Sequence, residues 1–319
     1  MKKILSIIIS VSLVVLTLCS CESKAEKYDG LKIICTAFPQ YDFVKNILGS
    51  EEGLTLLLDD GADLHSYEPT AQDIINIGTD DIFIYGGGVS DEWAEGVIRS
   101  ANNPELKAIA VMDLVDTLEE EYVSGMQQEN HNHEHNIAHS GDHSGEDEHV
   151  WLSIKNAITI TRSLCEVICE VDPDNSEIYL SNTENYISQL TALDVEYENV
   201  ISSSARKTIL FADRFPFRYL TEDYGLTYYA AFAGCSSESE ATFETMAFLI
   251  SKTKELNLPY VLTIDSSDGS LAKTVCESTG SKTAVLDSCQ SVSSVDISNG
   301  ASYLKIMKSN LEVLREALN

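Results

Sequence analysis

The chain has 319 residues, 44% of them hydrophobic, and a formal net charge of -30 at pH 7. This length suggests about two domains of roughly 150 residues each. The strong acidity excludes nucleic acid as a partner, because phosphates require clustered Lys and Arg. An acidic surface favours the binding of cations, although a role in solubility alone would also account for the negative charge.

The N-terminus has the pattern of an export signal. Two lysines precede an apolar run that is shorter than the roughly 20 residues needed to span a membrane. The Leu-Cys-Ser-Cys stretch at 18–21 is similar to a bacterial lipobox. We therefore expect residues 1–20 to be a signal peptide, with a lipid on Cys21. Residues 21–29 would tether the protein to the outer face of the cell membrane, which is an extracytoplasmic location.

Short β-type runs alternate with helical patterns along the rest of the chain. Strands are expected at residues 32–36, 54–58, 82–85, 108–111, 208–211, 227–232, 260–264 and 283–286. Alternation of strands and helices predicts parallel sheets that are covered by helices. We expect an α/β fold with two α/β lobes, at residues 30–171 and 204–319.

A long helix is predicted between the lobes, at residues 172–203. Asp172 and Pro173 provide a cap and a first-turn proline. One apolar stripe follows at spacings of three and four, formed by Tyr186, Leu190, Leu193, Tyr197 and Val200. At 1.5 Å per residue the helix would reach roughly 40 Å, enough to join two lobes.

Residues 126–148 form an acidic, histidine-rich segment. No Lys or Arg occurs between Lys107 and Lys155. Five of the seven histidines lie in this segment: His131, His133, His135, His139 and His143. Low apolar content predicts a mobile loop up to about Asp147. Neutral imidazoles in such a loop would give weak, exchanging auxiliary metal sites. An accidental polar linker is the alternative.

The two remaining histidines lie in specific motifs. His65 belongs to Gly-Ala-Asp-Leu-His-Ser-Tyr-Glu-Pro-Thr, and His149 to Asp-Glu-His-Val-Trp-Leu-Ser. These stretches resemble the G-x-D-P-H-x-Y-E-P-T and D-P-H-x-W-L motifs of the cluster A-I (cluster 9) family, the metal-binding lipoproteins of zinc and manganese importers. Leu64 and Glu148 replace the two prolines. The resemblance covers residues 30–319, and the histidine-rich loop is typical of zinc-specific members.

The resemblance implies a mononuclear metal site in the cleft between the lobes. The first lobe would contribute His65 and His149. The second lobe would contribute a third histidine and a carboxylate, and the segment Tyr-Val-Leu-Thr-Ile-Asp-Ser-Ser matches the family at Asp265. The family's usual histidine is missing, because Ala212 occupies its register and no histidine follows His149.

The sequence leaves the second-lobe ligand open. Asp213 is our candidate, although neighbouring strand residues point to opposite faces and the chain would have to bend there. Arg214 could pair with Asp213 instead. Cys235, Glu238 and Glu240 are rivals, and zinc also accepts three protein ligands and a water. The chain has no Cys-x-x-Cys pair, so a thiolate zinc cluster is not expected.

The resemblance predicts a monomeric solute-binding protein that captures Zn²⁺ as its transported ligand and delivers it to the membrane permease of an ABC importer. No catalysis is expected. The alternatives are manganese or iron capture, because oxygen-rich sites suit manganese better, and an adhesion or surface-interaction lipoprotein. A hydrolase is a weaker alternative, because HExxH, GxSxG and GxxxxGK[ST] motifs are absent from the sequence.

Overall fold

The structure is a computed structural model. It describes residues 30–59, 64–127, 145–236, 240–290 and 292–319. The expected signal peptide, Cys21 and the five loop histidines lie outside these residues. Residues Leu31–Asn319 form one compact unit. Within the described ranges, no helix combines the length and the apolar character needed to cross a membrane.

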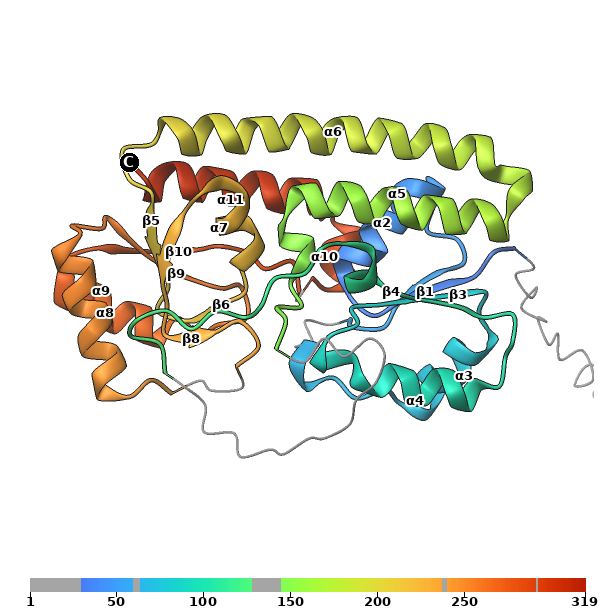
Figure 1. Cartoon of the computed structure of the whole chain (residues 1–319), viewed down its shortest axis with the longest axis horizontal. Helices are drawn as coiled ribbons and strands as arrows, with labels where there is room; N and C mark the ends of the chain where they lie inside the picture. The colour runs from blue at the N-terminus through green and yellow to red at the C-terminus, as the bar shows by residue number, and fades with distance from the viewer. Residues whose placement is uncertain (1–29, 60–63, 128–144, 237–239, 291) are drawn as a thin grey trace, which may run out of the picture. The chain divides into compact units, whose positions relative to one another are not determined.

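The first half is built on one four-stranded parallel sheet. Its strands are β1 (Ile33–Cys35), β2 (Leu54–Leu56), β3 (Ile82–Tyr85) and β4 (Lys107–Ala110), in the order β2-β1-β3-β4. Its helices are α2 (Phe38–Leu48), α3 (Ala71–Thr79), α4 (Glu92–Ala101) and α5 (Ile154–Val171). Figure 1 shows α3 and α4 on one face of this sheet and α2 and α5 on the other.

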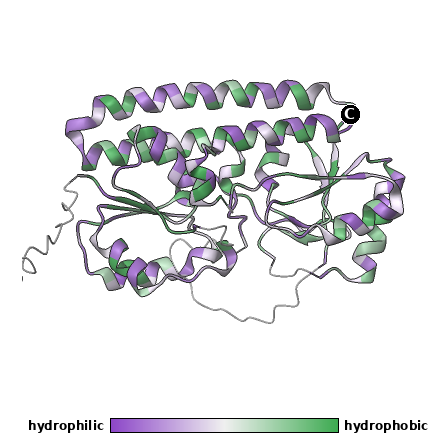
Figure 2. Cartoon of the chain, turned by 180° about the vertical axis from the view of Figure 1, so that it is seen from behind, coloured by the Kyte–Doolittle hydropathy of each residue, from purple (hydrophilic) through white to green (hydrophobic). Residues whose placement is uncertain are grey.

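Both faces of the first sheet are buried. Alternate residues of β1 point to opposite sides, so Ile33 packs into the cluster on the side of α2, whereas Ile34 packs with α3 and α4. Phe83 of β3 joins Ile34 in that smaller cluster. A strand buried on both faces has a continuous apolar sequence, and Figure 2 shows green hydrophobic residues along this sheet.

The second half carries short parallel strand pairs. Its strands are β5 (Thr208–Leu210), β6 (Arg214–Phe215), β7 (Thr227–Tyr229), β8 (Phe232–Ala233), β9 (Tyr260–Thr263) and β10 (Lys282–Val285). Strand β5 pairs with β7, β9 with β10, and β6 with β8. The Ala212 N–H donates to the Leu262 C=O at 3.0 Å and so links the end of β5 to β9.

The helices of the second half flank these strands. They are α7 (Arg218–Tyr224), α8 (Phe243–Glu255), α9 (Ser270–Thr279), α10 (Ser294–Ser298) and α11 (Tyr303–Ala317). All eight expected strand positions contain strands, so the predicted α/β fold with parallel sheets is confirmed. The expected strand at 227–232 is divided into β7 and β8, and β6 was not expected.

The predicted linking helix is present as α6 (Ser176–Ser203), after a short turn at Pro173–Asn175. Its Tyr186 hydroxyl donates to Asp42 of α2 in the first half, at 3.2 Å. Its Tyr197 hydroxyl donates to the Met307 C=O of α11 in the second half, at 2.6 Å. The same helix therefore packs on both halves, beside α5 and α11 (Figure 1).

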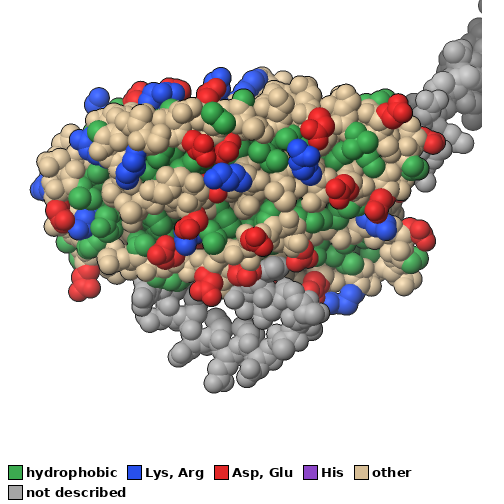
Figure 3. All heavy atoms as spheres, turned by 45° about the horizontal axis from the view of Figure 1, so that its top comes forward, with side chains coloured by type: hydrophobic (Ala, Val, Ile, Leu, Met, Phe, Trp, Pro, Cys, Tyr) green, Lys and Arg blue, Asp and Glu red, His purple; other side chains and the backbone are tan. Residues whose placement is uncertain are grey.

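The outer face of the helical layer has mixed character. Figure 3 shows acidic and basic side chains interspersed with hydrophobic ones on this face. Ile178, Leu180 and Val195 of α6 are among the exposed apolar residues. Because both signs of charge are mixed there, the acidic excess of the chain does not by itself locate a metal site.

The two ends of the histidine-rich segment are ordered, which corrects the prediction of a mobile loop up to Asp147. The Glu120 N–H donates to the Gly145 C=O at 2.9 Å, and the Asp147 N–H donates to Leu118 at 2.8 Å. The Gln127 N–H donates to the Ala231 C=O of the second half at 2.9 Å. These backbone partners are distant in sequence, so composition alone could not reveal them.

Candidate metal centre

His65 lies on a single 3-10 turn, Leu64–Ser66, between β2 and α3. Leu64 is buried and anchors the turn in the core. The His65 Nδ1 atom lies 2.8 Å from the Ser90 Oγ atom and 3.1 Å from the Glu148 Oε1 atom. A carboxylate can only accept, so this contact places the imidazole proton on Nδ1 and directs the basic Nε2 lone pair elsewhere.

His149 precedes another 3-10 turn, Val150–Leu152, and is completely buried. Its backbone N–H and its ring Nδ1–H both donate to Asp147 Oδ1, each at 2.9 Å. The His149 Nε2 atom is buried with no hydrogen-bond partner among the described residues. The His149 and His65 ring centroids are 5.4 Å apart. This pattern leaves a buried lone pair beside a second imidazole.

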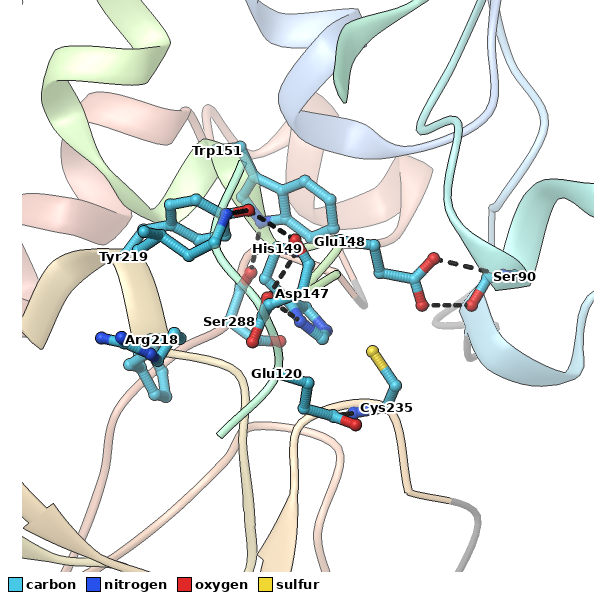
Figure 4. Close-up of polar contacts among 12 residues, drawn as sticks. Ser90, Glu120, Asp147, Glu148, His149, Trp151, Arg218, Tyr219, Cys235 and Ser288 are labelled. Carbon is cyan, nitrogen blue, oxygen red and sulfur yellow. Dashed lines mark hydrogen bonds and ion pairs between the residues drawn. The ribbon is translucent and has the colours of Figure 1, made fainter. Parts of the chain in front are cut away.

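Asp147 and Glu148 each hold one of the two histidines. Asp147 orients His149, and Glu148 contacts His65 while it accepts the Ser90 hydroxyl at 2.5 Å and the Ser90 N–H at 3.1 Å. Figure 4 shows the Glu148 carboxylate directed toward Ser90. A carboxylate bound to the far nitrogen fixes the tautomer and orientation of a metal-binding histidine.

The hydrogen-bond and charge partners of Glu148 and His149 shift the pKa values of these two residues. Burial by itself would raise the pKa of Glu148, but the hydrogen bond and charge of His65, with lesser contributions from His149 and Ser90, lower it to about 2. Burial would lower the pKa of His149, but the Asp147 carboxylate outweighs burial and raises it. The pKa of Glu148 thus depends on His65, and that of His149 depends on Asp147.

The Glu148 side chain packs directly against the backbone of Gly88, where a glycine leaves room for it. A Cβ atom at this glycine would lie 2.3 Å from Glu148 Oε2 and 2.6 Å from the Glu148 Cβ. Any side chain at this position would therefore displace the carboxylate from Ser90. The Gly88 position was not identified from the sequence, because its requirement arises only from the approach of a segment 60 residues away in the chain.

Cys235 brings the second half to this site. Ligand atoms of His65, Glu148 and Cys235 all lie within 4.8 Å of one another, the single such group of three found in the described part of the chain. The Cys235 N–H donates to Glu120 Oε1 at 3.0 Å. Burial raises the pKa of the Cys235 thiol well above its usual range. Figure 4 shows Cys235 next to Glu120, its backbone hydrogen-bond partner.

Asp265 follows β9, where the resemblance placed the carboxylate ligand. Its Oδ1 atom accepts the Ser288 N–H at 2.7 Å and the Ser288 hydroxyl at 2.8 Å. The Ser288 C=O in turn accepts the Trp151 indole N–H at 3.0 Å. This chain of hydrogen bonds connects Asp265 to the turn that follows His149, but Asp265 is not part of the three-residue group.

Asp213 also lies outside that group. It follows the end of β5, and its Oδ1 atom accepts the Arg214 N–H at 2.9 Å. Its Oδ2 atom is buried and has no hydrogen-bond partner among the described residues. Burial raises the pKa of the carboxyl, and the Ser267 hydroxyl and the Arg214 N–H oppose this. The prediction that Asp213 is a ligand therefore remains to be tested.

Sequence reasoning identified His65 and His149 but gave no role to Glu148. One feature of the sequence could have indicated Glu148: an acidic residue replaces the proline of the family motif directly before His149. Cys235 was only one of three rivals, with Glu238, which lies outside the described residues, and Glu240. The six cysteines within the described ranges are free thiols.

Two α/β halves that share a spanning helix and bring histidines, carboxylates and a thiol together define a metal-binding protein. The profile of the family "Zinc-uptake complex component A periplasmic" matches residues 33–317. The chain belongs to this family.

Individual relatives agree with this assignment. The chain is 30% identical to the zinc-binding lipoprotein AdcA of Streptococcus pneumoniae, over 99% of this chain and 61% of that protein. It therefore spans about three fifths of the length of that relative. It is 29% identical to the high-affinity zinc uptake system protein ZnuA of Bacillus subtilis, over 94% of this chain and 90% of that protein.

Solved structures show the same fold. The Zn(II)-bound ZnuA-like domain of Streptococcus pneumoniae AdcA is 27% identical, with a TM-score of 0.72, over 90% of this chain and 98% of that domain. The laminin-binding adhesin of Streptococcus agalactiae has a TM-score of 0.76 over 91% of this chain and 100% of that protein. Its identity is 20%, so this likeness concerns the fold alone.

Proposed function

We propose that this protein captures Zn²⁺ outside the cytoplasm and delivers it to the permease of an ABC importer. The observation that carries the proposal is the His149 Nε2 atom, which is buried without a partner beside the His65 ring. A buried polar atom without a partner is costly unless it has a role, and a metal ion would supply the missing interaction. The names of the AdcA and ZnuA relatives support zinc as the ion.

The first half would bind the ion through His65 and His149. Two imidazoles suit zinc, and carboxylates on the far nitrogens make them more basic ligands. Asp265 is the proposed carboxylate of the second half. Its Oδ1 atom is engaged by Ser288, so metal binding would use the other oxygen or release the Ser288 contacts. No reaction has to be catalysed for this function.

Export and anchoring complete the proposal. Residues 1–20 would be removed as a signal peptide, Cys21 would carry the lipid, and residues 21–29 would form the tether. The five histidines of the loop would collect zinc weakly and raise its concentration near the tighter site. This arrangement places capture beside the membrane, where the permease is reached without a long diffusional search.

A competitive titration tests the choice of metal. The purified protein, kept in detergent with its lipid, is made metal-free and titrated with Zn²⁺ and Mn²⁺ against a chromophoric chelator. We expect one tight zinc site and a preference over manganese of more than about tenfold, because imidazole and the Irving–Williams order both favour zinc. Equal retention of manganese would refute zinc capture and support the manganese alternative.

A further inference from the structure

The second half offers a thiol to the two histidines. Cys235 follows β8 and the glycine at position 234. Its sulfur belongs to the group of ligand atoms from His65 and Glu148 that lie within 4.8 Å of one another. Three side chains from segments that are distant in sequence thus converge on one small volume.

The His149 ring lies against the residue that precedes Cys235. A Cβ atom built on Gly234 would lie 3.2 Å from the His149 Cε1 atom, which sits between the two ring nitrogens. Because Asp147 holds Nδ1, the nitrogen of this ring that is left for a metal is the unpartnered Nε2 atom.

The backbone around Cys235 is fixed on both sides. The hypothetical Cβ at Gly234 would also lie 2.9 Å from the Phe215 C=O, so only glycine fits this close approach. The Cys235 N–H donates to the Glu120 carboxylate, which lies in the described residues before the histidine-rich segment. The thiol is therefore held in position by contacts that do not require a metal.

We propose that Cys235 is a second metal ligand from the second half, beside the Asp265 carboxylate, and takes the role that Ala212 cannot fill. The inference rests on the proposed function. The ion would be bound by His65, His149 and the Cys235 sulfur, with an oxygen donor as the fourth ligand. On binding, the thiol S–H bond breaks, the sulfur coordinates Zn²⁺, and the proton passes to the solvent.

Glu148 serves this site as a positioning residue. Its two oxygens are already occupied by the Ser90 hydroxyl and N–H and by His65. Moving it onto the metal would break three contacts and release the His65 ring. Cys235, in contrast, orients neither histidine: its N–H donates to Glu120, and its thiol also bonds with the Glu120 carboxylate and the Glu148 backbone. Ligation by the sulfur would therefore release neither imidazole ring.

A thiolate ligand makes a specific spectroscopic prediction. Cobalt(II) in the site should produce a near-ultraviolet sulfur-to-metal charge-transfer band and the visible bands of tetrahedral coordination. Cys235→Ser and Cys235→Ala should abolish the near-ultraviolet band and weaken zinc binding by about tenfold or more. Cys276→Ser is the matched control, because Cys276 is a partly exposed cysteine on α9. It should leave both readouts unchanged.

Asp213→Ala separates the two candidate ligands. If Cys235 is the ligand, this variant keeps the charge-transfer band and binds zinc within about threefold of the wild type. A loss of more than about tenfold in Asp213→Ala, with normal binding by Cys235→Ser, would overturn the assignment in favour of Asp213.

Alkylation of the wild-type protein gives a result that does not depend on variant folding. The metal-free protein is first alkylated with iodoacetamide at alkaline pH, where more of the thiol is ionised, to give the reference modification of Cys235. One equivalent of zinc should then lower this modification, as measured by peptide mass spectrometry, and leave that of Cys276 unchanged. One tight cobalt ion without a charge-transfer band, or unprotected Cys235, would refute the thiolate ligand and leave zinc capture intact. Absence of any tight site would refute the proposed function itself.

Discussion

Replacing Asp147 by Asn tests the support of His149 most directly. In the wild type, one carboxylate oxygen accepts both the backbone N–H and the ring Nδ1–H of His149, each at 2.9 Å. The amide oxygen of Asn can accept the same bonds, but it carries no charge. Charge-assisted hydrogen bonds are roughly twice as strong as neutral ones. The shape of the site should therefore persist while the imidazole becomes a poorer ligand.

The expected loss is about tenfold to a hundredfold in zinc affinity, which corresponds to about 1.4 to 2.7 kcal/mol. Backbone contacts of Asp147 with Leu118 and Tyr219 do not involve the substituted group and should be kept. Chelator competition measures the affinity, and thermal unfolding of the metal-free protein monitors the fold.

Asp223→Asn is the matched control. This carboxylate accepts the Ser153 hydroxyl at 2.6 Å in the same region of the fold, but it contacts neither histidine in the described structure. Its zinc affinity should equal that of the wild type. A contradicting result would be that Asp147→Asn binds zinc like the wild type while His149→Ala does not bind zinc. The Asp147 carboxylate would then not be needed to orient the His149 ring, and our account of the unpartnered Nε2 atom would be wrong.

Three further predictions concern other parts of the chain. Replacing residues 128–144 by a short Gly-Ser linker should lower the zinc stoichiometry but leave one tight site, and loss of that site would mean that the loop supplies primary ligands. Gly88→Val should displace Glu148 and weaken zinc binding by about tenfold, with Gly96→Val, whose Cβ meets nothing within 4 Å, as the control. Burial raises the pKa of Asp42 to about 6, so the contribution of Asp42 to folding stability should fall as the pH rises from about 4 to 6 and then level off. Asp42→Asn should remove about 3 kcal/mol of this fall, measured as urea midpoints at pH 4 and pH 7, and an unchanged pH profile would contradict it.

Local patterns determined much of the fold. The apolar runs of β1 and β3 specify strands that are buried on both faces, and the stripe on α6 specifies a long helix with one packed side. Both signals are short in range, because they depend on the periodicity of side chains along one segment. The motifs around His65 and His149 likewise indicated the first-half part of the proposed site.

The sequence by itself was enough to predict the fold class and to select His65 and His149 as candidate ligands. The tertiary structure decided which groups surround these two histidines. Glu148 contacts His65 across 83 positions of the chain, and Cys235 reaches the same group from the second half. Glu148 and Cys235 are single residues that belong to no periodic pattern, so the sequence around them does not reveal their partners. Their role depends on how β8, the Gly88 turn and the segment before the histidine-rich loop pack together, which is a long-range property of the folded chain.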